Sequence, residues 1–196
     1  MLVIGLTGGI GMGKSTAAEI LRKMGLPIYH ADKAVHTLLK KNGAAVKPIA
    51  KIFPQALKNG AINRAALGHI VFHHPARLPR LEKILHPLVH KVEREFLRKA
   101  REKKAKAAVL EIPLLFETGA QKRCDYVICV TAPQKIQHTR VMRRPGMTRA
   151  KLKGIYERQM PDTKKRKLAD FVVDTGGTRA GTKRQLRLVL RRILGE

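Results

Sequence analysis

A glycine-rich stretch near the start of the chain constrains its fold more than any other feature. It reads GLTGGIGMGKST over residues 5–16 and contains the pattern G-x-x-x-x-G-K-[ST], from Gly8 to Ser15. The apolar run 1–4 before it has strand character, and residues 17–24 after it place apolar side chains at helical spacing. A strand, a glycine loop and a helix in this order direct backbone N–H groups and the helix N-terminus at an anion. The stretch therefore predicts a nucleotide phosphate site, and a turn that binds nothing is the less favoured alternative.

The residues at the end of this loop carry the predicted chemistry. Lys14 can reach the β- and γ-phosphates of ATP, and the Ser15 hydroxyl can ligate Mg²⁺. ATP and Mg²⁺ are therefore the predicted cofactors. The residues predicted to bind the nucleotide are Gly11, Met12, Gly13, Lys14, Ser15 and Thr16.

The net charge is strongly positive, with 41 Lys and Arg against 14 Asp and Glu, or +27. Such a charge indicates acidic partners, either small polyanions or nucleic acid, although a generally basic proteome would also explain it. No helix-turn-helix, RNP or zinc-finger pattern is present, and aromatic residues make up only 4% of the chain. We therefore expect no specific nucleic-acid partner, and a nucleic-acid-binding ATPase remains the alternative from a different class.

Cysteine content and hydropathy bear on the compartment. Cys124 and Cys129 form no C-x-x-C pattern and are too few for a disulfide framework; Cys129 lies in an apolar run and is expected in the core. No run reaches membrane-spanning length, and no signal peptide is recognisable. The expected location is the cytoplasm, with no membrane partner.

Strand-like runs alternate with helical patterns over much of the chain. We expect strands at 1–4, 27–29, 107–112, 125–131 and 169–174, and a last helix at about 182–194. This alternation is typical of an α/β fold with a parallel, doubly wound sheet of five strands.

The segment from residue 42 to about 101 follows a different rhythm. We expect only short helices there, at 44–52, at 63–72 with Asn63 as N-cap, at 76–85, and a long one after Pro87. By analogy with other phosphotransferases of this fold, a helical insertion at this point binds the phosphate acceptor. The predicted organisation is a nucleotide-binding core of residues 1–32, 107–139 and 168–196, an acceptor-binding insertion of residues 33–106, and a lid of residues 140–167.

The predicted lid is basic, with eleven Lys and Arg residues and only two acidic ones. Arginines in such a lid can stabilise transition-state charge on the phosphates, while most of the basic residues are expected simply to face solvent. Arg140, Arg143 and Arg144 are the candidates, and Arg140 is favoured because it lies on the helix directly after the fourth strand. Which of the three engages phosphate stays open.

Carboxylates supply the other candidate groups. Asp32 follows the second strand, at the edge where the glycine loop ends, and can accept the proton of an acceptor hydroxyl; alternatively it is the N-cap of a helix that starts at Lys33. Glu111, near the end of the third strand, can hold Mg²⁺ through water or pair with a lysine. The histidines form no H-E-x-x-H pattern, so no zinc site is predicted.

Several further segments match one family at the expected order and spacing. They are Ala31-Asp32, Leu85-His-Pro-Leu-Val89, Ile112-Pro-Leu-Leu-Phe-Glu117, Gln137 with Arg140, Gln159-Met-Pro161 and Ala169-Asp-Phe-Val-Val-Asp174 followed by Gly176. Together with the loop they make the chain resemble the dephospho-CoA kinases over nearly its whole length. The loop alone is shared by many nucleotide enzymes, whereas the segments at 85–89 and 112–117 are more specific.

This resemblance implies a P-loop kinase that transfers the γ-phosphate of ATP to the ribose 3′-hydroxyl of dephospho-CoA, the last step of coenzyme A synthesis. Asp32 falls on the family's proposed base, Lys14 and Arg140 fall on its phosphate contacts, and Leu114 lines the acceptor side. His86, in the segment 85–89, and Arg143 are further predicted substrate contacts. A nucleoside or sugar kinase with the same fold is the alternative, and the oligomeric state is left open.

The chain departs from the family pattern at three of these positions. His30 replaces the first residue of the usual Asp-Ala-Asp, so only Asp32 can act as the base. Met12 replaces Ser, which the loop is expected to tolerate because it contributes a backbone N–H there. Thr175 replaces a common Asn, which leaves the contacts of the fifth strand's end with the adenine side open.

Overall fold

The computed structural model describes residues 1–195, and these form two compact units. The first unit comprises residues Met1–Tyr29 and the chain from Ala100 onward, and the second comprises His30–Lys99. No helix in the described range is long and apolar enough to cross a membrane.

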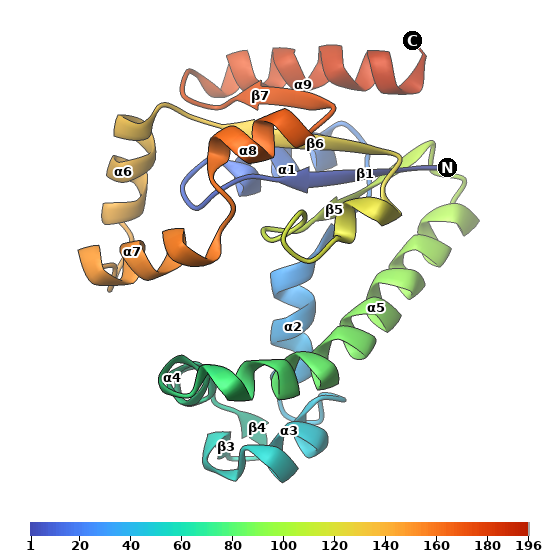
Figure 1. Cartoon of the computed structure of the whole chain (residues 1–196). Helices are drawn as coiled ribbons and strands as arrows, with labels where there is room; N and C mark the ends of the chain where they lie inside the picture. The colour runs from blue at the N-terminus through green and yellow to red at the C-terminus, as the bar shows by residue number, and fades with distance from the viewer. Residues whose placement is uncertain (196) are drawn as a thin grey trace. The chain divides into compact units, whose positions relative to one another are not determined.

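A five-stranded sheet forms the centre of the first unit (Figure 1). Its order is β2-β5-β1-β6-β7, and the strands are β1 (Leu2–Thr7), β2 (Ile28–His30), β5 (Ala107–Glu111), β6 (Tyr126–Thr131) and β7 (Phe171–Asp174). The strands are parallel, with Leu6 opposite both Glu111 and Ile128. The predicted parallel α/β sheet of five strands is therefore confirmed. Because parallel strands end at the same edge, the ends of β1, β5, β6 and β7 are brought together there.

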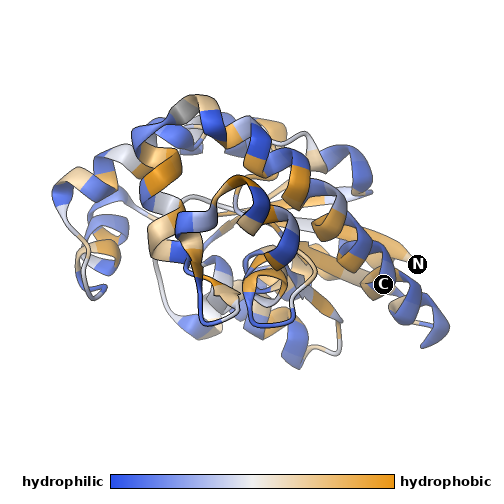
Figure 2. Ribbon diagram, turned by 90° about the horizontal axis from the view of Figure 1, so that it is seen from below, coloured by the Kyte–Doolittle hydropathy of each residue, from blue (hydrophilic) through white to orange (hydrophobic). Residues whose placement is uncertain are grey.

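Helices cover the sheet on its two faces. Helix α1 (Lys14–Lys23) packs against α9 (Arg179–Leu194), which also contacts β7, whereas α8 (Asp162–Leu168) contacts β6. Every residue of β5 is buried, as expected for a strand covered on both sides. Figure 2 accordingly shows hydrophobic residues along the strands and both hydrophobic and hydrophilic residues along the helices. Cys129 in β6 is fully buried, so its predicted place in the core is confirmed.

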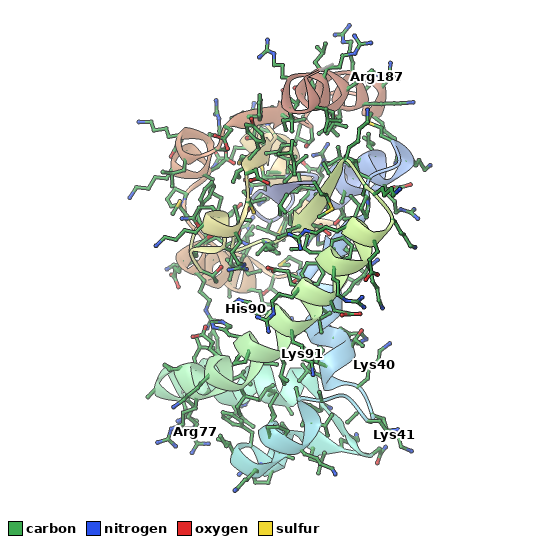
Figure 3. The ribbon with its side chains drawn as sticks, turned by 90° about the vertical axis from the view of Figure 1, so that its right-hand side faces the viewer. Lys40, Lys41, Arg77, His90, Lys91 and Arg187 are labelled. Carbon is green, nitrogen blue, oxygen red and sulfur yellow. The ribbon has the colours of Figure 1, made fainter. Side chains whose placement is uncertain are left out.

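The basic segment after β6 is helical. It comprises the end of α6 (Gln134–Met142), then α7 (Arg149–Arg158) and α8, and the short 3-10 helix η3 (Ala120–Arg123) precedes β6. Arg187 on α9 is exposed and points outward in Figure 3. Most of the chain's positive charge is therefore carried on such exposed helical faces.

The second unit has its own hydrophobic core, built around Ile49 and Phe53. Its elements are α2 (Ala31–Leu39), α3 (Val46–Ile52), η1 (Pro54–Ala56), β3 (Leu57–Lys58), β4 (Ala61–Ile62), α4 (Arg64–His73), η2 (Pro75–Arg77) and most of α5 (Leu78–Glu102). Asn63 is the N-cap of α4, where its side chain accepts a 3.0 Å hydrogen bond from the backbone N–H of Ala66. The exposed Lys40, Lys41 and Arg77 lie on the outside of this unit (Figure 3).

Two predictions for this unit are wrong. The helices expected on either side of Pro87 are one helix, α5, with Pro87 inside it. Proline removes one helical hydrogen bond and costs about 3 kcal/mol in a helix interior. The apolar face around it, which includes Leu81 and Leu88, packs on the core of the unit and outweighs that cost.

The segment expected to contain no strand has a small antiparallel hairpin, β3–β4. The two residues that connect its strands, Asn59 and Gly60, both have positive φ angles, of 51° and 75°. That conformation at both central residues is typical of a two-residue hairpin turn, for which Asn-Gly is the favoured sequence.

Candidate active site

The glycine loop connects β1 to α1 in the first unit, as the sequence predicted. Gly8, Gly11 and Gly13 have φ angles of 154°, 75° and 78°. A Cβ at Gly8 would lie 2.6 Å from the carbonyl oxygen of Val130, and one at Gly13 would lie 2.5 Å from the Thr175 hydroxyl. The loop therefore needs glycine at these positions, because it packs directly against the ends of β6 and β7.

Lys14 is the first residue of α1, and its ammonium group contacts a buried carboxylate. Lys14 Nζ lies 2.7 Å from Oε1 of Glu111, the last residue of β5. The register explains the contact, because Glu111 lies opposite Leu6, just before the loop begins. Of the two roles considered for Glu111, pairing with a lysine is thus observed. The pair fixes the ammonium group at the loop, where a phosphate would need it.

Ser15 and Thr16 complete the first turn of α1, and the Ser15 side chain is exposed. The backbone N–H groups of this turn have no partner within the helix and are available to an anion. Mg²⁺ takes one or two protein oxygens together with substrate phosphates, so an exposed serine hydroxyl here is a suitable donor. Among the described residues no cluster of three His, Cys, Asp or Glu side chains could hold a metal ion.

Arg140 in α6 is held at the end of β7. Its guanidinium donates to the Thr175 hydroxyl at 3.0 Å and to the Thr175 carbonyl oxygen at 2.6 Å. The Thr175 hydroxyl in turn donates to the carbonyl oxygen of Met12 at 3.0 Å. Two of the three positions that depart from the family pattern, Met12 and Thr175, are therefore in direct contact, and Thr175 links Arg140 to the loop.

Met12 does more than supply a backbone N–H to the loop. Its side chain is buried, and its sulfur accepts a hydrogen bond from the backbone N–H of Ala132 at 3.1 Å. Its own backbone N–H donates to the carbonyl oxygen of Gly9 at 3.2 Å. Methionine thus takes a packing role that the smaller serine of the usual pattern would leave unfilled.

Lys165 in α8 is a site residue that the sequence did not single out. It is fully buried, and its ammonium group lies 2.9 Å from both Glu117 Oε1 and the carbonyl oxygen of Pro113. Glu117 Oε1 also accepts from the backbone N–H of Met160 at 2.7 Å. These contacts tie the segment after β5 to the end of the predicted lid. In the sequence analysis Lys165 is only one of the eleven basic residues of the predicted lid. Its structural role was missed because composition does not distinguish a buried lysine from its exposed neighbours.

A cavity of about 810 Å³ lies beside the loop, between α6, α8 and the end of β7. Gly9 and Met12 from the loop line it, together with Gln137 from α6 and Gln159 from the C-terminal end of α7. Asp162, at the start of α8, also lines it and accepts a 2.8 Å hydrogen bond from the Thr131 hydroxyl.

Asp32 lies in the second unit, two residues beyond the end of β2. The expectation that it is an N-cap is wrong, because α2 starts at Ala31 with His30 as N-cap, and Asp32 is the second helical residue. Its side chain is exposed and makes no hydrogen bond or ion pair with any described residue. The carboxylate is therefore available for another role.

The structure leaves the other predicted substrate contacts on the surface. Leu114 is 37% exposed in the turn after β5, and Arg143 is the exposed C-cap of α6. His86 is exposed on α5, with its ring 6.3 Å from that of His90. Within the first unit the structure thus brings Lys14 to Glu111 and Arg140 to the loop.

Comparisons with known proteins identify a family with which this chain shares most of its sequence length. The family model described as dephospho-CoA kinase matches residues 2–180. The chain is 48% identical to a dephospho-CoA kinase of Brucella melitensis over 196 residues, covering 100% of this chain and 97% of that protein. It is 46% identical to one of Rhizobium meliloti over 190 residues, covering 97% of each.

Solved structures give the same result. The dephospho-CoA kinase of Campylobacter jejuni superimposes with a TM-score of 0.72 at 30% identity, covering 98% of this chain and 97% of that one. A shikimate kinase of Acinetobacter baumannii, at 17% identity and a TM-score of 0.52 over 100% and 94% of the two chains, shares the fold alone. These findings confirm the predicted P-loop kinase fold and the resemblance read from the motifs. The chain belongs to the dephospho-CoA kinase family.

Proposed function

We propose that this protein transfers the γ-phosphate of ATP to the ribose 3′-hydroxyl of dephospho-CoA, which gives coenzyme A and ADP. The observation that carries the proposal is the glycine loop with Lys14 fixed by Glu111, in a chain that matches the family over residues 2–180. In the reaction the acceptor oxygen bonds to the γ-phosphorus, the bond from that phosphorus to the bridging oxygen of ADP breaks, and the hydroxyl proton leaves.

The first unit supplies the donor site. The backbone of Gly11–Thr16 surrounds the phosphates, and Lys14 balances their charge. The Ser15 hydroxyl would hold Mg²⁺, and Glu111 would contribute at most through water, because its Oε1 is engaged by Lys14. Mg²⁺, when bound, neutralises charge that develops on the phosphate oxygens.

Asp32 acts as the general base and takes the proton of the 3′-hydroxyl. Its support is local: an exposed carboxylate two residues after β2 that has no hydrogen-bond or ion-pair partner among the described residues. His30 cannot replace it as a carboxylate, so the activity depends on this one residue. A positioned general base contributes about 10²- to 10⁴-fold in rate.

The remaining parts of the chain take the roles that the family suggests. Residues 33–106 bind the acceptor, with Leu114 and His86 as contacts, and residues 140–167 act as the lid over ATP. Arg140 and Arg143 provide cationic side chains for the phosphates. The protein works in the cytoplasm on a small molecule and has no specific nucleic-acid partner.

Acceptor-dependent ADP release tests the proposal. With Mg-ATP, rapid turnover is expected on dephospho-CoA and little on gluconate or nucleosides; the reverse pattern would refute the assignment. Asp32→Asn is expected to lower kcat by at least about 100-fold with little change in ATP affinity. Glu95→Gln serves as its control, because Glu95 is an exposed carboxylate that pairs with Arg98 and Lys99 on α5. An unchanged kcat in Asp32→Asn would exclude it as the base.

The Lys14→Ala variant checks the donor site separately. It is expected to weaken both ATP binding and turnover, because Lys14 belongs to the loop proposed to bind the phosphates. Specific binding of duplex DNA at physiological salt would instead support the nucleic-acid alternative, whereas binding lost between low and physiological salt would reflect only the net charge.

A further inference from the structure

One residue in the glycine loop, Ile10, has both of its backbone polar groups bonded to side-chain amides. Gln137 Nε2 donates to the carbonyl oxygen of Ile10 at 2.8 Å, and the N–H of Ile10 donates to Gln159 Oε1 at 3.1 Å. The backbone fixes the orientation of both amides, because a carbonyl can only accept and an N–H can only donate. Gln137 must therefore present its nitrogen and Gln159 its oxygen.

The two glutamines lie on either side of the chain segment that includes α7. Gln137 is buried in α6, and Gln159 is the C-cap residue of α7. Figure 1 shows α6 and α7 as separate helices with α8 following them. The chain between the two glutamines is therefore bound to Ile10 at both of its ends.

Neighbouring contacts hold each glutamine in place. A Cβ at Gly11 would lie 3.0 Å from the backbone carbonyl oxygen of Gln137, so α6 packs directly on the loop. The residue after Gln159, Met160, is bound through its N–H to Glu117. Neither amide is a mobile surface group, and each can hold a fixed hydrogen bond.

Ile10 stands between two glycines, whose backbones have more conformational freedom than any other residue's. A loop that is free before binding must lose that freedom when phosphate binds, which weakens affinity. A loop already held by neighbouring side chains does not incur this loss, and its donors are in place before the transition state forms.

We propose that Gln137 and Gln159 are positioning residues that hold the glycine loop in its phosphate-binding conformation through Ile10. Both side chains also line the cavity beside the loop, and the effect proposed for them acts through their hydrogen bonds to Ile10. The inference rests on the proposed kinase function for its effect on turnover, but its effect on nucleotide binding is independent of the acceptor.

Glutamate substitutions distinguish the two positions. Gln159→Glu keeps an oxygen acceptor for the N–H of Ile10, whereas Gln137→Glu replaces the donor with an acceptor that faces a carbonyl oxygen. Each adds the same negative charge beside the same residue, so general repulsion of the nucleotide affects both. Thr139→Glu, at an exposed position of α6 outside the cavity lining, is the control for charge on that helix.

Binding of a fluorescent ADP analogue to the full chain with Mg²⁺ is the primary measurement. We expect Gln137→Glu and Gln159→Met to weaken binding by about 10-fold, the loss of roughly one hydrogen bond, and Gln159→Glu to retain affinity within about 3-fold. Melting temperatures measured in parallel show whether a variant is folded. Wild-type turnover on dephospho-CoA is measured separately, so failure of the proposed function would not be confused with failure of this inference.

A pH series gives a signature that a purely structural role would not produce. As pH is lowered from about 8 to about 5, the affinity of Gln137→Glu for the ADP analogue should rise relative to that of wild type. The reason is that a protonated glutamate regains an O–H donor for the carbonyl oxygen of Ile10. The proposal is overturned if Gln137→Glu binds as wild type does, or if Gln159→Glu is as weak as Gln159→Met in folded protein.

Discussion

Lys165 offers the strongest test of how this fold is held together. Its side chain is fully buried, yet its ammonium group is charged and bound to Glu117 and to the carbonyl oxygen of Pro113, each at 2.9 Å. Lys165→Met keeps most of the aliphatic length and removes the charge. The variant leaves Glu117 with a largely buried carboxylate, and within residues 1–195 the N–H of Met160 is its remaining hydrogen-bond partner.

The expected magnitude follows from the burial of the pair. Removing one partner of a buried ion pair costs about 3–5 kcal/mol, because the other charge stays buried without compensation. The side chain of Glu117 is 17% exposed, so some water reaches it, and its Oε2 has no hydrogen-bond partner in the part of the chain that the structure describes. We therefore expect the lower end of that range, about 3 kcal/mol. For a chain of this length that corresponds to a fall in Tm of roughly 6–12 °C.

A double-mutant cycle measures the pair itself. Thermal and urea unfolding are followed by circular dichroism for Lys165→Met, Glu117→Gln and the double variant. The double variant is expected to be more stable than the sum of the two losses predicts, by at least about 1 kcal/mol, because it buries no uncompensated charge. Lys164→Met, at the exposed neighbouring position in α8, is the matched control and should stay within about 0.5 kcal/mol of wild type. A loss below about 1 kcal/mol in Lys165→Met, or strict additivity, would refute the reasoning.

Three further predictions rest on single contacts. Gly13→Ala should abolish nucleotide binding and lower the Tm, because its Cβ would lie 2.5 Å from the Thr175 hydroxyl at a φ of 78°; binding as in wild type would contradict this. Burial raises the pKa of the Cys129 thiol from about 9 to about 12, so the thiol ionises more easily in the unfolded state than in the folded state. The free energy of unfolding should therefore fall as pH rises from 9 towards 12, and this fall should be less steep in Cys129→Ala. Asn63→Ala should cost about 1 kcal/mol by removing the cap of α4, measured by urea unfolding, and an unchanged midpoint would contradict it.

Features that depend on a few consecutive residues were predictable from the sequence. The glycine loop, the strand at 107–111 and the cap at Asn63 each follow from short-range chemistry: positive φ angles, an unbroken apolar run, and an amide placed to accept a helical N–H. Gly25 likewise follows α1 with a φ of 90°, as expected for a residue that ends a helix.

Features that depend on distant partners were not predictable in the same way. In the sequence, Pro87 predicts the end of a helix. The helix continues through it because the apolar face of α5 packs on the core of the second unit. The hairpin at Asn59-Gly60 was missed although its turn sequence is a recognised signal, because a helical rhythm on both sides outweighed two short strands. Lys165 pairs with Glu117, and Arg140 donates to Thr175; the residues of each pair lie far apart in the sequence. No local pattern therefore indicates either contact.

The hydrogen bonds of the loop also narrow the predicted nucleotide site. The backbone N–H of Ile10 is engaged by Gln159 and that of Met12 by Gly9, so the protein itself uses donors in the middle of the loop. Helix α1 begins at Lys14, with Gly13 as its N-cap, and the N–H groups of the first turn have no partner within the helix. Of the six predicted residues, Met12 is therefore excluded as a backbone donor to phosphate, and we expect the donors among Gly11, Gly13, Lys14, Ser15 and Thr16. Met12 instead serves the site by packing, which explains how the loop accepts methionine at a position where the family usually has serine.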